Sequence, residues 1–597
     1  MAGSTEPRFS RDAPQLTVRA VLSGMVIGAL LTPCNVYSGL KIGWTFNMSV
    51  ASGLIGFAFW TAARRSMGTP EYGLLENNIN QTTASSAASI VSAGLVAPIP
   101  ALAMLTGQTL SLPILVIWMF VVSALGVVVA AGMRNQLLFR ENLPFPSGVV
   151  TAETMREIHD GGSEAHARLR LLTLAGVVSA AVKFVVSGFG IGKASLPIKL
   201  SLGASGGSTA PIGVSGMNLG FALDPSLLMI GFGAISGLRI GASVLLGAIV
   251  GWGLLAPMAL HYEWIEPGLN DPQAVWFGDL IGWLLWPGVA MMVTASLTSF
   301  AISTIKLVLQ RREKRPPDPR MVIAGTIDHR KLIPAFVVAL IMCVIAQTSI
   351  FGIGLMEAFI AVLLSYVLAI VSARVSGETA ITPIGALGKI TQFTFAAISP
   401  SNVTANLMTA NVTGGAAGQC ADLMHDLRTG QMIGANPGFQ VVAQVFGVLT
   451  GSLVAAITYL ALIPEPQTQL LTQEWPAPAV ATWKAVAEVI SVGFDALPPA
   501  SIEAIFIGTI IGVGLAVLES VVGPSARRFI PSGSAVGLGF VIPAWNSMSL
   551  FAGALIAMLI AHLFPEWAKR RLIVVVAGLI VGESLAGVVS ATAGFLA

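Results

Sequence analysis

Four stretches of this 597-residue chain contain no charged residue over 19 to 25 consecutive positions. They are residues 112–132, 240–260, 332–350 and 439–463. A helix needs about 20 apolar residues to cross the roughly 30 Å of hydrocarbon in a lipid bilayer. The apolar residues are continuous rather than alternating, which argues against membrane β-strands. The sequence therefore predicts an all-α polytopic membrane protein.

Composition supports this class. Charged residues make up 10% of the chain and its mean hydropathy is +0.80, whereas soluble domains carry about 25% charged residues. Counting apolar segments predicts about 14–16 transmembrane helices in two related halves, and the first apolar run, 20–33, is expected to be retained as a span. The three cysteines show no spacing typical of a disulfide or a metal site. The net charge of +3 gives no indication of a nucleic-acid partner.

Basic residues predict the orientation of the chain. They precede the first span and crowd a central loop, 311–331, while loops 262–273 and 464–483 contain acidic residues and no Lys or Arg. Because cytoplasmic loops are enriched in Lys and Arg, the N-terminus and the central loop are expected in the cytoplasm, and the two acidic loops outside the cell membrane. The expected organisation is a cytoplasmic tail (1–15), a first transmembrane repeat (16–310), a basic cytoplasmic linker (311–331) and a second transmembrane repeat (332–597).

Weak similarities between the two halves indicate an internal duplication. Residues 237–247 resemble 578–588, and the polar run 76–89 resembles 402–418, in consistent order. Cytoplasmic ends on both sides of the first half favour parallel repeats. The basic loop around Arg134 would align with an external loop, which favours inverted repeats, and both arrangements stay open.

Two matching triplets place a glutamate within apolar sequence: Gly377-Glu378-Thr379 and Gly582-Glu583-Ser584. A carboxylate at the bilayer centre costs about 2.5 to 10 kcal/mol, so it is retained where it is paired or has a function. One interpretation is structural, as a helix cap or as a partner of Arg374 or Lys389. The other is that Glu378 and Glu583 carry the coupling proton, because desolvation favours the neutral acid.

Three polar stretches, 70–94, 198–220 and 399–440, contain too many helix breakers to face lipid. We expect residues 76–89 of the first stretch and 402–418 of the last to form discontinuous helices that meet near the bilayer centre around a shared cavity. The alternatives are small-residue packing faces and, for 198–220, an ordinary loop. The predicted substrate-binding residues are the amides, hydroxyls and charges in and beside these stretches: Glu76, Asn77, Asn80, Gln81, Thr82, Asn402, Asn406, Asn411, Lys41 and Lys389. The alternative for each lysine is that its side chain extends to the membrane surface.

An enzyme of the intramembrane transferase class is a rival interpretation. Asp422 and Asp426 are four residues apart and could hold Mg²⁺ from one helix face, but no second acidic cluster is predicted to face them. We therefore expect neither catalytic nor metal-binding residues. The chain also has no GxxxxGK[ST] motif, which argues against ATP-driven transport by this chain alone.

Several segments resemble the oligopeptide transporter (OPT) family, and specifically its prokaryotic and yellow-stripe-like members. They are ENNINQTTASSAAS, FPSGVVTAETMREIH, SGETAITPIGALGKITQ, GQCADLMHDLRTGQMIGANPGFQVVAQVFG and AGLIVGES. The Asn436-Pro437-Gly438 tripeptide lies late in this chain, unlike the NPG motif near the N-terminus of the eukaryotic peptide-transporter clade, so it is not equivalent.

The resemblance implies about sixteen helices and proton-coupled import of small peptides or, in the yellow-stripe-like branch, of metal–chelate complexes. The expected function is a proton-coupled secondary transporter for small oligopeptides, with a siderophore or nicotianamine-like metal complex as the alternative substrate. The expected partners are this substrate, protons and membrane lipid. No cofactor is expected, because the proton gradient is the driving force. The oligomeric state stays open.

Overall fold

The computed structural model describes residues 13–45, 47–160, 163–202, 212–309, 327, 329–379, 381–494 and 497–596. The first half contains helices α1 (Val18–Ile42), α2 (Ser49–Met67), α3 (Leu74–Ser89), η1 (Ile90–Ala93), α4 (Pro98–Thr106), α5 (Leu112–Arg134), η2 (Asn135–Arg140), α6 (Pro146–His159), α7 (Ser163–Gly188), α8 (Leu227–Ser236), α9 (Leu238–Val250), η3 (Gly251–Leu255), α10 (Ala256–His261) and α11 (Phe277–Leu309). Its strands are β1 (Ala194–Ser195), β2 (Lys199–Leu202), β3 (Ile212–Ser215) and β4 (Ala222–Leu223).

The second half is helical wherever it has regular structure in the described residues. Its helices are α12 (His329–Phe351), α13 (Leu355–Thr379), α14 (Ile384–Ile398), α15 (Val403–Ile433), α16 (Pro437–Leu462), α17 (Pro466–Gln469), α18 (Pro478–Val492), α19 (Ser501–Val521), α20 (Pro524–Arg527), α21 (Gly533–Val541), α22 (Ala544–Leu563), α23 (Pro565–Trp567), η4 (Ala568–Leu572) and α24 (Ile573–Leu596).

Twelve helical segments among the described residues are long and apolar enough to cross a membrane. This confirms an all-α polytopic membrane protein. Twelve is fewer than the 14–16 spans expected from the sequence. The difference has a physical cause, because α2 and α15 are long enough to cross but too polar to be counted, whereas α8 and α14 are apolar but short.

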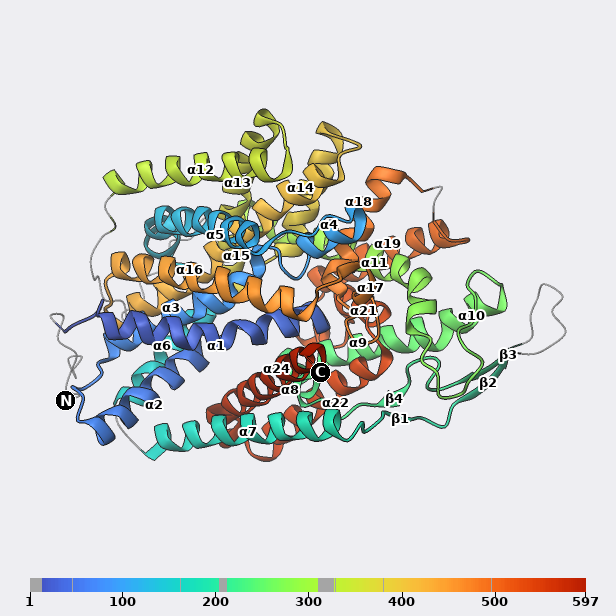
Figure 1. Cartoon of the computed structure of the whole chain (residues 1–597), viewed down its shortest axis with the longest axis horizontal. Helices are drawn as coiled ribbons and strands as arrows, with labels where there is room; N and C mark the ends of the chain where they lie inside the picture. Colours follow the sequence, from blue (N-terminus) through green and yellow to red (C-terminus); the bar gives the residue numbers. More distant parts are fainter. Residues whose placement is uncertain are drawn as a thin grey trace.

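The two halves of the chain pack into one interleaved bundle (Figure 1). Helix α3 of the first half lies against α16 of the second, α5 against α15, α7 against α24 and α8 against α22. Small residues permit the close approach of α16 to α3, since a Cβ atom at Gly447 would lie 2.3 Å from the carbonyl oxygen of Thr83. The predicted repeats, 16–310 and 332–597, are therefore not separate bodies in space.

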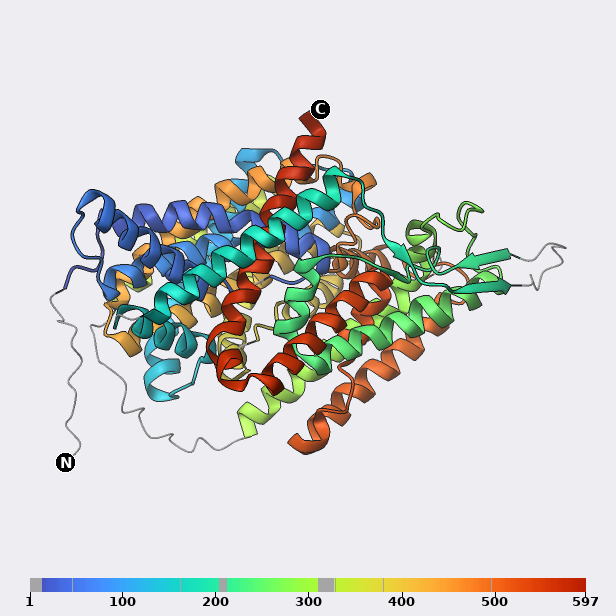
Figure 2. The same ribbon diagram turned by 90° about the horizontal axis from the view of Figure 1, so that it is seen from below.

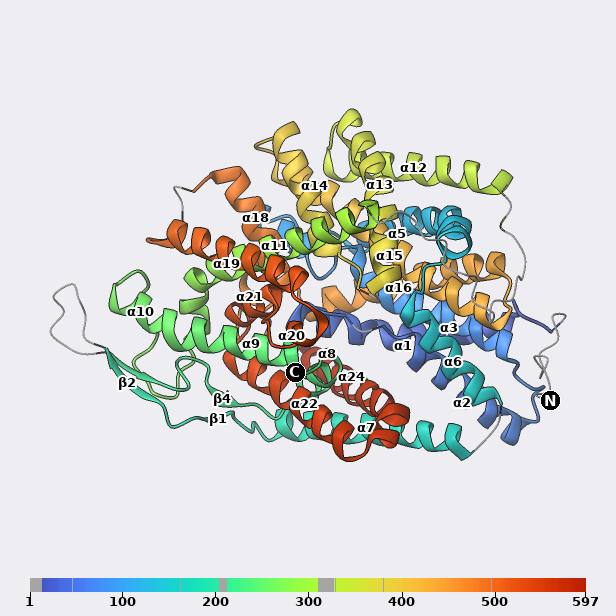
Figure 3. The same cartoon turned by 180° about the vertical axis from the view of Figure 1, so that it is seen from behind.

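Helix α15 lies at the centre of the bundle, enclosed by α3, α5, α6, α13, α14 and α16 (Figure 3). With 31 residues it is about 46 Å long. Every residue from Ala405 to Ile433 is buried except Asp422, which is partly exposed. Many of the buried residues are polar, so the interior of this membrane protein is built around a polar helix.

The expected breaks within the polar stretches are only partly present. Residues 76–89 form continuous helix, and the break follows at 90–97, where η1 interrupts the helical run. Residues 403–418 belong to the uninterrupted α15, so the expected discontinuous helix at 402–418 was wrong. Side chains there bond within the helix instead of breaking it, as when the Thr409 hydroxyl donates to the carbonyl oxygen of Ala405 at 2.7 Å.

The third polar stretch, 198–220, forms a β-ribbon and not a cavity lining. Strand β2 pairs with β3 and β1 with β4, all antiparallel, and the ribbon extends beyond the helices at one end of the molecule (Figure 2). Asn218 attaches it to the neighbouring acidic loop, since its Nδ2 donates to the carbonyl oxygens of Asp271 and Ala274, both at 2.9 Å. Residues 203–211 lie outside the described part of the chain.

Two groups of elements lie at opposite ends of the molecule. The N-terminal ends of α1 and α12 lie at one end of the molecule, and α10 with the ribbon lies at the other (Figure 1). The predicted tail and linker fall mostly on residues 1–12 and 310–326, which lie outside the described residues.

We expect single cysteines to report the predicted orientation. In a background without the three native cysteines, which are buried, Asn270→Cys and Gln473→Cys should react with an impermeant maleimide added outside intact cells. Asp318→Cys should react only after the cells are opened, because its loop is rich in Lys and Arg. Labelling of Asp318→Cys and Gln473→Cys from the same side would contradict the predicted topology.

Candidate functional site

A buried carboxylate on the central helix connects three helices. Asp426 of α15 is 2% exposed, and its carboxylate accepts hydrogen bonds from Gln81 Nε2 (2.6 Å), Ser85 Oγ (2.8 Å) and Ser49 Oγ (3.3 Å). The first two donors come from α3 and the third from α2. The Gln440 side chain of α16 also donates to the Asp426 carbonyl oxygen at 2.7 Å.

All three donors to the Asp426 carboxylate are neutral. No Lys, Arg or His forms an ion pair with it in the part of the chain that the structure describes. A buried charge without a counter-charge is costly, and gaining a proton removes that cost. A proton would also turn one acceptor oxygen into a donor, so the hydrogen bonds from α2 and α3 would rearrange. The protonation state of Asp426 is thus tied to helix packing.

Neighbouring polar groups on α15 extend this centre. His425 is 4% exposed; its Nε2 lies 3.0 Å from Ser376 Oγ of α13, and its ring meets Phe145 edge-on. Asp422 lies one turn before Asp426. The sequence pointed to Asp422 and Asp426 through their spacing and to Ser85 and Gln440 as members of polar stretches. It gave no signal for Ser49 or for the pairing of these groups with Asp426, because the partners are distant in sequence.

Glu76 is not free to bind a substrate. Its carboxylate, 2% exposed for the whole residue, accepts from Arg19 Nη2 at 2.5 Å, Arg19 Nε at 2.8 Å and Thr17 Oγ1 at 2.7 Å. Arg19 also donates to the carbonyl oxygens of Pro70 and Glu71. The pair therefore fixes the start of α3 to the start of α1.

Two amides of α3 are likewise used between helices. Asn77 Nδ2 donates to the Gly53 carbonyl oxygen at 3.1 Å and lies 3.1 Å from His159 Nε2. Desolvation lowers the pKa of His159 to about 4, so the ring is neutral near pH 7 and this nitrogen can accept. Asn80 Nδ2 donates to the Ser52 carbonyl oxygen of α2, and Asn80 Oδ1 accepts from Ser23 Oγ of α1.

Further candidates hold the central helices in place. Gln440 Nε2 lies 3.5 Å from Thr82 Oγ1. The Asn402 side chain accepts from Ala405 N at 2.9 Å and caps α15. Asn411 closes the break after α3, since its Nδ2 donates to the Ala93 carbonyl oxygen at 2.9 Å and its Oδ1 accepts from Trp118 Nε1 at 2.7 Å.

The two lysines differ in their surroundings. Lys41, at the end of α1, donates to the Glu474 carbonyl oxygen and lies over the ring of Trp475, 4.7 Å from its centroid. Lys389 of α14 is 2% exposed; it donates to Gln392 Oε1 at 2.8 Å and lies 4.3 Å from the ring centroid of Trp483. It does not extend to a membrane surface.

The matching glutamates lie in unlike environments. Glu583, 5% exposed, accepts from Ser226 Oγ and Leu228 N, both at 2.7 Å, and so caps the N-terminus of α8. Glu378 is partly buried near the end of α13. Arg374 of α13 forms an ion pair at 2.8 Å with Glu141, which follows η2 in the first half.

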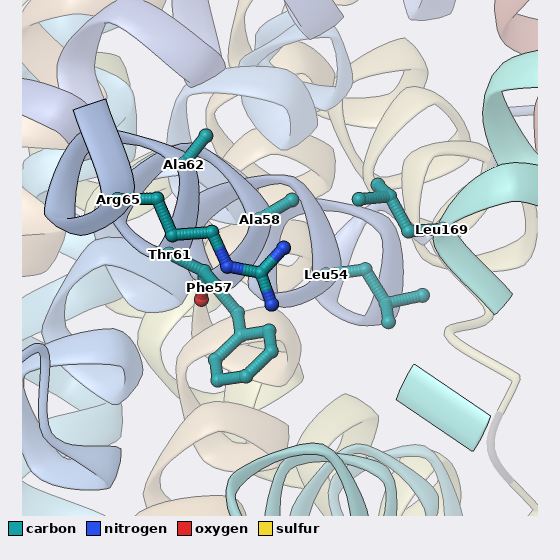
Figure 4. Close-up of a pocket in the computed structure, with 7 residues that line it drawn as sticks. All are labelled: Leu54, Phe57, Ala58, Thr61, Ala62, Arg65 and Leu169. Carbon is teal, nitrogen blue, oxygen red and sulfur yellow. The ribbon is translucent and has the colours of Figure 1, made fainter. Parts of the chain in front are cut away.

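Two small cavities lie between helices of the bundle. One of about 100 Å³ lies between α2 and α7 (Figure 4), and another of about 20 Å³ lies between α4, α5 and α16. The first is lined by Leu54, Phe57, Ala58, Thr61, Ala62, Arg65 and Leu169. Ligand pockets usually enclose about 300–1,000 Å³, so neither can hold a peptide. No cluster of three His, Cys, Asp or Glu suited to a metal ion occurs among the described residues.

A bundle of helices long and apolar enough to cross a membrane, packed around a buried polar helix, defines the class of integral membrane proteins. Residues 15–593 match the profile of a family described as "OPT oligopeptide transporter protein". The chain therefore belongs to the OPT oligopeptide transporter family and is a transporter, not an enzyme.

Curated relatives cover nearly the whole chain. One is "Putative oligopeptide transporter YGL114W" of Saccharomyces cerevisiae, 25% identical over 96% of this chain and 95% of its own length. Another is "Metal-nicotianamine transporter YSL2" of Arabidopsis thaliana, 23% identical over 96% and 92%. "Probable metal-nicotianamine transporter YSL6" of rice, Oryza sativa subsp. japonica, is 24% identical over 97% and 91%.

Proposed function

We propose that this protein imports small oligopeptides across the cell membrane, with its N-terminus in the cytoplasm, and that an inward proton gradient drives the import. The observation that carries the proposal is the buried Asp426 carboxylate, which is held by neutral donors from two other helices. Ionisable groups inside membrane proteins commonly belong to substrate or proton pathways.

Coupling requires that the proton and the substrate favour the same conformation, because equal affinity for both conformations would transmit nothing. Protonation of Asp426 from the outside would release the bonds that hold α2 and α3 against α15. Proton release inside would restore them. The same carboxylate can therefore link proton movement to an exchange between outward-open and inward-open states.

Glu378 and Glu583 stay candidates for the coupling proton. The contacts of Glu583 favour a capping role, since both oxygens already hold the start of α8. Asp426 is the stronger candidate because its carboxylate links its own helix, α15, to two others, α2 and α3, which would move relative to it.

Metal–chelate complexes are the alternative substrate. Several curated relatives are named as metal-nicotianamine transporters, and chelators of this kind present amino and carboxylate groups much as a peptide does. The absence of a metal-ligand cluster in the described residues is compatible with either substrate, since a chelated metal needs no protein ligands.

Uptake into proteoliposomes tests the proposal directly. With an inward proton gradient, we expect labelled trialanine or pentaalanine to accumulate above its external concentration, and a protonophore to abolish the accumulation. Iron–nicotianamine uptake in the same vesicles measures the alternative. Accumulation of the iron complex with no peptide uptake would replace the proposed substrate, and uptake indifferent to the gradient would remove the proton coupling.

A further inference from the structure

Lys389 lies between two helices that are too short to cross a membrane. Helices α14 and α18 each contain 15 residues and are about 22 Å long, and they pack against each other and against α15 (Figures 1 and 3). Transporter substrate sites are typically formed by discontinuous helices, whose halves are shorter than a full membrane span. The ring of Trp483 lies directly against α14, since a Cβ atom at Gly388 would be 2.3 Å from it.

The polar groups around Lys389 form a connected cluster. Lys389 Nζ donates to Gln392 Oε1, and Gln392 Nε2 donates to Asn406 Oδ1 at 3.0 Å. Asn406 Nδ2 returns a bond to the Gln392 carbonyl oxygen at 2.7 Å. Gln392 and Asn406 are 0% and 2% exposed. The two amides thus hold one another in place and aim one oxygen at the ammonium group.

This cluster lacks an anion. In the described residues no Asp or Glu forms an ion pair with Lys389, whose partners are one amide oxygen and the face of Trp483. An ammonium group has three N–H donors, so this set leaves donor capacity unused. A buried charge is costly unless it is paired, and a carboxylate would supply both the missing charge and the missing acceptors.

The neighbouring Lys484 shows the contrast. It follows Trp483 on α18 and pairs with Glu488 at 2.7 Å, four residues away on the same helix. The chain therefore provides an internal counter-ion for a mostly buried lysine of this region, whereas no described Asp or Glu pairs with the fully buried Lys389.

We propose that Lys389 binds a carboxylate group of the transported substrate, with Gln392 and Asn406 positioning the ammonium group and Trp483 forming one wall. This inference rests on the proposed function and specifies its substrate class: molecules with a free carboxylate, such as peptides with an unmodified C-terminus. In the present conformation α14 and α18 close over the lysine, and the carboxylate reaches it when these helices separate.

The test compares uptake of trialanine with uptake of trialanine amide, which lacks the C-terminal charge. Wild-type proteoliposomes should take up the acid about tenfold or more faster than the amide at low concentration, because an unpaired buried group penalises the ligand that does not satisfy it. Lys389→Met should lower the ratio of acid uptake to amide uptake to about one. Lys389→Arg should retain a preference for the acid, and Lys484→Met should retain the wild-type ratio.

The outcomes are separable. If wild type transports neither peptide, the proposed function fails and the inference falls with it. If wild type transports both at equal rates, or Lys389→Met keeps the preference for the acid, peptide transport stands and the role of Lys389 is overturned. If Lys389→Met does not fold, as judged by gel filtration in detergent, Lys389→Arg decides. Loss of all preference for the acid in folded Lys389→Arg contradicts the proposal. Equal uptake of trialanine and trialanine amide by wild type contradicts it as well.

Discussion

Asp426→Asn is expected to abolish the accumulation of substrate against its gradient while leaving exchange of substrate across the membrane intact. Asparagine has the shape of aspartic acid and keeps an oxygen that accepts from Gln81 and Ser49, but it can neither bind nor release a proton. The variant should therefore still move between conformations with substrate bound. The accumulation ratio should fall to about one, because no proton energy reaches the substrate.

The measurement is the ratio of internal to external labelled substrate at steady state, beside the rate of exchange in vesicles loaded with unlabelled substrate. Glu566→Gln, which removes an exposed carboxylate from α23, is the control and should behave as wild type. Glu378→Gln and Glu583→Gln belong in the same assay. If Asp426→Asn accumulates substrate as wild type does, whereas one of these two fails, that glutamate is the proton site.

Arg19→Ala is expected to lower the free energy of unfolding by several kcal/mol, although Arg19 is partly exposed. It would leave the Glu76 carboxylate, whose side chain is 3% exposed, without its cation, and it would remove bonds to the carbonyl oxygens of Pro70 and Glu71. Breaking a buried ion pair by removing one partner costs about 3–5 kcal/mol. Since the Arg19 side chain is 24% exposed, we expect a value at the lower end of this range.

Thermal unfolding in detergent measures the effect, and Arg64→Ala is the matched control. Arg64 also pairs with a glutamate, Glu71, but both side chains are largely exposed, so its loss should cost less than about 1 kcal/mol. The double substitution Arg19→Ala with Glu76→Gln should recover part of the stability, because no buried charge is left behind. Equal melting temperatures for Arg19→Ala and Arg64→Ala would show that the pair does not stabilise the fold.

The class of fold followed from the sequence because the free energy of placing apolar residues in lipid depends on local composition. Charge-free runs such as 112–132 and 439–463 became α5 and α16. The polar runs were harder to interpret. Residues 402–418 are rich in Asn, Thr and Gly, and the sequence suggested a broken backbone, yet residues 403–418 form continuous helix at the centre of the bundle, with Asn402 as its cap.

The sequence predicted many residues of the candidate site but not the partners that their side chains bind. Glu76 and Gln81 were both expected to meet substrate, since nothing in the local sequence reveals that Arg19 reaches the first and Asp426 the second. Likewise, the Gly-Glu-hydroxyl triplets at 377–379 and 582–584 look alike in sequence. Only in the fold does Glu583 of the second triplet meet the start of α8, which it caps. Such partners are set by tertiary packing between residues up to hundreds of positions apart.

Helix α15 also has a consequence for how the protein is made. Its buried face carries too many amides, hydroxyls and charges for the helix to leave the insertion machinery as an isolated lipid-facing segment, because release into the bilayer depends on hydrophobicity. Helices α3, α5 and α6 are synthesised before it and α16 after it, and all four cover it in the finished bundle. Its entry into the membrane therefore depends on neighbours that are already there, and truncation of the chain just after residue 433 should leave a product that quality-control proteases degrade.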